Sequence, residues 1–119
     1  MTKLSFEEQN KLIQAETDKI RDIFEDISDD KKRIADRLIE RVAFMTITLK
    51  ILEDDVKSKG PTYLFEQGSQ RMMVENPSQK SYNTMINRYT AACKELFNLL
   101  PKEIAVEQDD GFEAFIGKK

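Results

Sequence analysis

The strongest constraint on the fold is a long apolar repeat in the middle of the chain. Between residues 31 and 57, large apolar side chains recur at steps of three or four, namely Ile34, Leu38, Val42, Met45, Leu49, Leu52 and Val56. This spacing places them on one face of an α-helix. A second set widens that face until the helix is apolar almost all round between residues 42 and 52: Ala35, Ile39, Phe44, Ile47 and Ile51.

A helix that is apolar almost all round is normally buried on more than one side. In a chain of 119 residues, the second side is covered either by the chain itself or by another subunit. We therefore expect Phe44, Ile47 and Ile51 at subunit contacts or beneath the first helix.

A shorter helix is predicted before the repeat, over residues 6–26. Ser5 and Glu8 fit a capping box, in which each side chain accepts a hydrogen bond from the backbone amide of the other residue. The apolar residues that follow keep helical spacing: Leu12, Ile13, Ile20, Ile23, Phe24 and Ile27. Ser28 supplies capping chemistry for the start of the long helix.

The second half of the chain predicts a β-hairpin and a third helix. Gly60-Pro61 ends the long helix, and two β-prone runs, 62–65 and 71–74, flank a Gly-containing loop. Asn76-Pro77 then opens a helix expected to reach residue 100, with Gln79 completing its N-terminal cap. We therefore predict an all-α, mainly helical fold, in which a long antiparallel helical hairpin carries an N-terminal helix and a small β-hairpin.

The residue composition excludes most catalytic chemistry. The chain has no histidine, one cysteine and four isolated glycines, which excludes histidine-assisted catalysis, zinc sites built from His or Cys, and phosphate-cradling loops. The best candidate for a carboxylate-only Mg²⁺ site is Glu53-Asp54-Asp55, but consecutive acids diverge around a helix. We expect no enzymatic activity, cofactor, metal or small-molecule substrate.

The chain also lacks the features of membrane or secreted proteins. No stretch approaches the ~20 apolar residues that a membrane-spanning helix needs, and residues 1–10 lack the apolar core of a signal peptide. We expect a cytoplasmic protein without a membrane partner.

Charge divides the chain into three segments: an acidic N-terminal helix (1–30), a helical oligomerisation core (31–101) and a flexible acidic tail (102–119). Residues 1–30 carry 4 basic and 9 acidic groups, whereas residues 31–60 carry 8 basic and 5 acidic groups. An anionic partner would therefore meet the middle of the chain. The candidate phosphate contacts there are Lys31, Lys32, Arg33, Arg37 and Arg41.

The alternative interpretation of this basic segment is a solvated surface. Asp36 lies within reach of Arg33 as an i, i+3 partner, and Glu40 lies within reach of Arg37. In the acidic tail, Phe112, Phe115 and Ile116 are spaced so that one helical turn would align them. The tail is either a frayed end or a peptide that orders on docking.

The block from Asn76-Pro77 to Tyr89, the Leu99-Leu100-Pro101-Lys102 break and the Asp109 to Phe115 end resemble the small subunit of phage terminase. This resemblance covers roughly residues 30–119. It implies a homo-oligomeric ring that recognises phage DNA and regulates the terminase large subunit, an ATPase and nuclease in the host cell cytoplasm.

By the same resemblance, Phe112, Phe115 and Ile116 would dock on the large subunit. The family's DNA-contacting residues do not carry over one by one, so the DNA prediction uses only the basic character of residues 31–41. The alternative is a helical oligomeric scaffold or regulatory protein with protein partners only.

Overall fold

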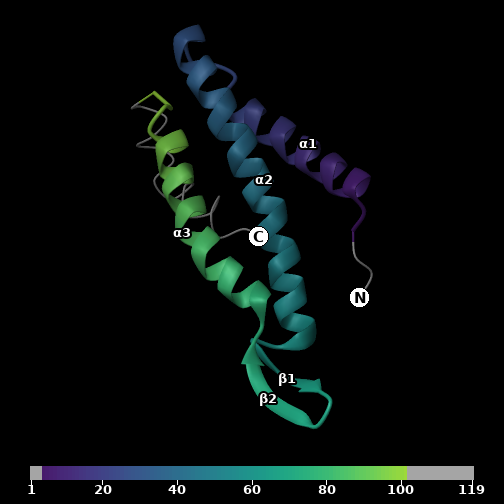
Figure 1. Ribbon diagram of the computed structural model, residues 1–119. Helices are drawn as coiled ribbons and strands as arrows, with labels where there is room; N and C mark the ends of the chain where they lie inside the picture. The colour runs from purple at the N-terminus through teal and green to yellow at the C-terminus, as the bar shows by residue number, and fades with distance from the viewer. Residues whose placement is uncertain (1–3, 102–119) are drawn as a thin grey trace.

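The computed structural model describes residues 4–101, within which the chain forms three helices and one two-stranded sheet. The elements are α1 (Phe6–Ile23), α2 (Asp29–Lys59), β1 (Thr62–Gln67), β2 (Gln70–Glu75) and α3 (Pro77–Phe97). Figure 1 shows α2 as the central helix, with α1 and α3 beside it and the β-hairpin projecting from one end. The predicted mainly helical fold with a small β-hairpin is confirmed.

The capping box at the start of α1 forms as predicted. Ser5 Oγ accepts from the Glu8 amide at 3.0 Å, and Glu8 Oε1 accepts from the Ser5 amide at 2.9 Å. The helix ends at Ile23 rather than at residue 26. The Phe24 amide donates to the Arg21 carbonyl, a tighter i→i−3 bond that ends the α-helical pattern.

The core lies where α1 and α3 both pack against α2. Its buried apolar residues are Ile20, Phe24, Ile27, Ala35, Ile39, Val42, Ala43, Leu49, Tyr89, Cys93, Leu96 and Leu100. The buried residues of α2 come from both predicted sets, Val42 and Leu49 from the first and Ala35 and Ile39 from the second. Ile34, which opens the first set, is 58% exposed.

The junction between α2, the hairpin and α3 is built around Asn76, which is only 1% exposed. Its Nδ2 donates to the Gly60 carbonyl at 3.0 Å, and its Oδ1 caps α3 by accepting from the Ser78 amide at 2.9 Å. Ser78 Oγ in turn donates to Asp55 Oδ2 at 2.6 Å, which lowers the pKa of Asp55. These bonds set the direction in which α3 returns along α2.

Two details of α3 differ from the prediction. Gln79 does not complete the cap, because its Nε2 donates instead to Asn83 Oδ1, one turn further along the helix, at 2.8 Å. The helix ends at Phe97 rather than at residue 100, since the Leu99 and Leu100 amides donate to the Leu96 and Phe97 carbonyls. These i→i−3 bonds form a tight turn ahead of Pro101.

Tyr89 provides a test of the α2–α3 packing at alkaline pH. Its ring is buried, Thr46 Oγ donates to its hydroxyl at 3.5 Å, and burial raises the pKa of Tyr89 to about 12. The unfolded state would lose this proton near pH 10, before the folded state does. We expect the free energy of unfolding to fall as pH rises from about 10 to about 12.

The measurement is urea unfolding followed by circular dichroism across this pH range. The Tyr89→Phe variant removes the ionisable hydroxyl and should weaken the pH dependence. An identical pH dependence in the variant would contradict the assignment to Tyr89.

Candidate nucleic-acid interface

The three predicted arginines form a row along the solvent side of α2. Arg33, Arg37 and Arg41 are all exposed, and their four-residue spacing sets them about 6 Å apart along the helix axis. Because four residues slightly exceed one helical turn, the row drifts around α2. Arg33 and Arg37 share a shallow depression with Glu95 of α3, and Arg41 reaches the edge of a larger groove.

The carboxylates expected to neutralise this row pair elsewhere. Asp36 Oδ1 lies 3.4 Å from Arg21 Nε, and Glu40 Oε2 lies 3.5 Å from Arg21 Nη2. The predicted pairing with Arg33 and Arg37 is therefore wrong, because α1 places the Arg21 guanidinium beside both carboxylates. Within residues 4–101, no ion pair involves any arginine of the row.

Lys31 and Lys32 belong to the first turn of α2 and are also exposed. Successive residues on a helix point about 100° apart, so these two lysines diverge and do not extend the row together. The structure therefore divides the five predicted contacts into an aligned arginine row and two separate lysines at the helix start.

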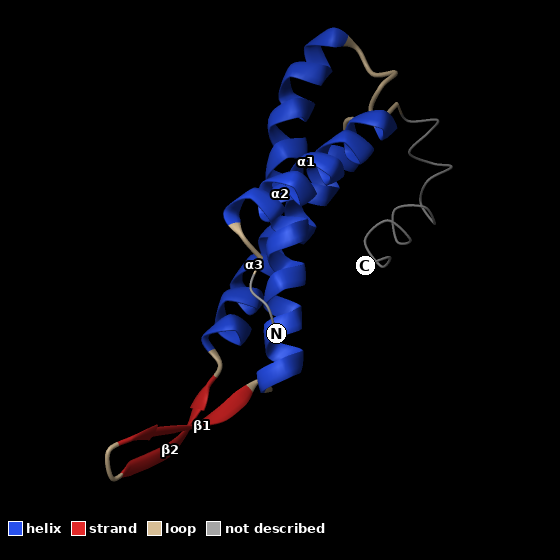
Figure 2. Ribbon diagram, turned by 90° about the vertical axis from the view of Figure 1, so that its right-hand side faces the viewer, coloured by secondary structure: helices blue, strands red, loops and turns tan. Residues whose placement is uncertain are grey.

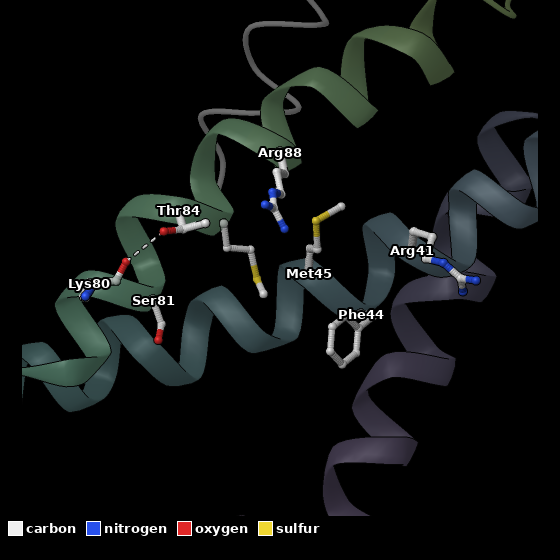
Figure 3. Close-up of a pocket in the computed structure, with 8 residues that line it drawn as sticks. Arg41, Phe44, Met45, Lys80, Ser81, Thr84 and Arg88 are labelled. Atoms are coloured by element: carbon white, nitrogen blue, oxygen red, sulfur yellow. Dashed lines mark hydrogen bonds between the residues drawn. The ribbon is translucent and has the colours of Figure 1, made fainter.

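Two further cations lie near the row on α3. Lys80 and Arg88 line a groove of about 530 Å³ together with Arg41, Phe44, Met45, Ser81, Thr84 and Met85. Figure 3 shows Arg88 reaching from α3 toward α2 above Met45, with the aromatic ring of Phe44 beside the groove. Sequence reasoning missed both cations, although their eight-residue separation corresponds to one helix face.

The combined surface is strongly basic. Arg33, Arg37, Arg41, Lys80 and Arg88 supply five positive charges. Among residues 4–101, Glu95 is the one acid that lines either depression, so these six side chains have a net formal charge of +4. The whole chain has a net charge of −3. The fold thus concentrates positive charge on the side of the α2–α3 pair that carries the arginine row. We refer to the five cations on this side, Arg33, Arg37, Arg41, Lys80 and Arg88, as the basic surface.

The residues predicted at subunit contacts lie on one side of α2. Phe44 is 48% exposed, Ile47 and Ile51 are half-buried, and none of the three belongs to the buried core. Their spacing of three and four residues aligns them on the helix. An apolar strip therefore continues from the groove toward the C-terminal end of α2.

The hairpin presents a second apolar surface. Leu64 pairs with Met73 on one face of the sheet, and Phe65 pairs with Met72 on the other, and all four side chains are exposed. Figure 2 shows the strands extending beyond the helices. Within residues 4–101, no other element buries these four side chains. A two-stranded sheet is marginal alone in water, so these pairs would gain stability from a partner.

Two of the acids of Glu53-Asp54-Asp55 form ion pairs with lysines one turn away on α2. Asp54 Oδ1 lies 3.6 Å from Lys50 Nζ, and Asp55 Oδ1 lies 3.3 Å from Lys59 Nζ. In the described part of the chain, no three His, Cys, Asp or Glu residues are grouped closely enough to hold a metal ion. None of its helices is long and apolar enough to cross a membrane.

Compared with protein-family models, curated protein sequences and solved structures, the chain matches none of them.

Proposed function

We propose that the protein is the small subunit of a phage terminase, a non-enzymatic adaptor that recognises viral DNA for packaging. The observation that carries the proposal is the exposed arginine row, whose neighbouring carboxylates are engaged by Arg21 instead. Cations without an internal partner are available to phosphates, and their contact with DNA gains free energy from counterion release. Lys80 and Arg88 widen the basic surface across α3.

Assembly into a ring is part of the same proposal. The strip formed by Phe44, Ile47 and Ile51 and the apolar pairs of the hairpin are surfaces that neighbouring subunits would cover. Repetition around a ring would multiply the basic surface, so that a modest charge on each protomer gives tight binding. The large terminase subunit would be recruited by Phe112, Phe115 and Ile116, which lie outside the described residues.

A second candidate function, a helical scaffold with protein partners only, is favoured by the exposed hairpin. Titration of the full chain with duplex DNA at increasing salt separates the two functions. The adaptor binds with an affinity that falls steeply as salt rises, whereas the scaffold shows no such binding. Absence of DNA binding at low salt by the assembled protein would refute the adaptor proposal.

The assembly surface is tested by Phe44→Glu. A charge buried at a subunit contact without a partner costs several kcal/mol, and every interface of a ring would contain one. We expect a lower assembly mass by light scattering with unchanged helix content by circular dichroism, because Phe44 is already 48% exposed within the chain. The matched control is Phe6→Glu on α1, where the side chain is 78% exposed. An unchanged mass for Phe44→Glu would place the interface elsewhere.

A further inference from the structure

We propose that the groove between α2 and α3 binds the C-terminal tail of its own chain, residues 102–119. The groove has apolar lining from Met45 and Met85 and three cations around it, Arg41, Lys80 and Arg88. Among the described residues, none of these cations takes part in an ion pair. The occupant should therefore be both acidic and apolar.

The tail has this chemistry. It contains five acids, Glu103, Glu107, Asp109, Asp110 and Glu113, interspersed with Phe112, Phe115 and Ile116. The aromatic rings would lie against the two methionines, whose thioethers make favourable contacts with aromatic groups. The carboxylates would meet the three cations, none of which is in an ion pair within residues 4–101. A basic or purely apolar peptide would leave one half of the groove unmatched.

The chain is long enough to make this return. Helix α3 ends at Phe97, and Met85 lies twelve residues earlier, which is about 18 Å along the helix axis. Phe112 lies eleven positions after Pro101, and an extended segment of that length spans up to roughly 36 Å. The tail can therefore fold back along α3 and bring Phe112 to the groove, with slack for a turn.

Docking would place acids beside the cations that we assign to DNA. The tail would then compete with phosphates, and a large subunit that captured the same aromatics would free the basic surface. This regulatory consequence rests on the proposed function, whereas the docking does not.

If the tail docks and the basic surface binds DNA, Phe112→Ala/Phe115→Ala should bind duplex DNA several-fold more tightly than the wild type at low salt. Equal affinity of the variant and the wild type would show that the tail does not compete with DNA.

Docking is tested without DNA, by NMR of the full chain labelled with ¹³C at its methionine methyl groups. Removing two rings from the groove should move the Met45 and Met85 signals in Phe112→Ala/Phe115→Ala. Met72 and Met73 lie on the hairpin and serve as internal controls, so their signals should stay in place. Unmoved Met45 and Met85 signals, or movement of the hairpin signals instead, would overturn the proposal.

A charge variant and a mixing experiment complete the test. Arg88→Glu should repel the acidic tail. In this variant, adding Phe112→Ala/Phe115→Ala should no longer move the Met45 and Met85 methyl signals. A shift as large as the one without Arg88→Glu would overturn the proposed ion pairing. Labelled Phe112→Ala/Phe115→Ala chains are also refolded together with excess unlabelled wild-type chains. Own-chain docking predicts no recovery of the wild-type signals, whereas recovery would assign the tail in the groove to a second copy.

Discussion

Replacing Arg33, Arg37 and Arg41 together with alanine should remove most of the DNA affinity at moderate salt. The logarithm of the binding constant falls linearly with the logarithm of the salt concentration, and each phosphate contact adds about 0.9 to the steepness of this line. Losing three contacts should therefore reduce the steepness by roughly 3 per protomer. In an oligomer the loss is repeated in every subunit that touches DNA. The measurement is fluorescence anisotropy of a labelled duplex over a salt series.

The matched control is the triple alanine variant at Lys11, Lys19 and Lys57. These exposed lysines lie on α1 and near the end of α2, and their replacement changes the net charge by the same amount. Binding by this variant should stay near that of the wild type. Equal losses in the two variants would indicate a general charge effect, and unchanged binding in the arginine variant would identify the row as a solvated surface.

Asn76→Ala should be the most destabilising single substitution at the junction of the helices and the hairpin. It removes the cap of α3, worth about 1 kcal/mol, and leaves the Gly60 carbonyl without the Asn76 hydrogen bond, which costs about 1–3 kcal/mol for a buried group. A total loss of roughly 2–4 kcal/mol corresponds to a fall of more than about 10 °C in the melting temperature of a domain this size.

Two further variants test this account of Asn76. Asn76→Ser retains a capping oxygen but loses the amide donor to Gly60, so it should be destabilised by less than Asn76→Ala. Asn87→Ala removes an exposed asparagine from the same helix and should leave stability almost unchanged. Circular dichroism melts at one fixed protein concentration measure all three, because assembly makes the melting temperature depend on concentration. Equal melting temperatures for Asn76→Ala and Asn87→Ala would show that the junction contributes little.

The sequence by itself determined the elements, because their signals are local. Ser5 and Glu8 are close enough in sequence to cap α1 whatever the rest of the chain does. Asn76-Pro77 likewise specifies the start of α3 through the restricted backbone of proline and the short reach of the asparagine side chain. The alignment of the three arginines could be predicted from the helical period alone, because their four-residue spacing places them on one face of a helix. Helix ends were less predictable, since tight turns after Ile23 and Phe97 depend on how the following residues pack.

Tertiary structure decided which of these side chains are free to act. Spacing along α2 allowed Asp36 and Glu40 to pair with the arginine row, and only the packing of α1 places Arg21 beside both carboxylates. The groove combines Arg41 of α2 with Lys80 and Arg88 of α3. Both α3 residues lie about 40 or more positions after Arg41 in the sequence. Ion pairing and groove formation depend on distances between separate helices, whereas periodicity describes one helix at a time.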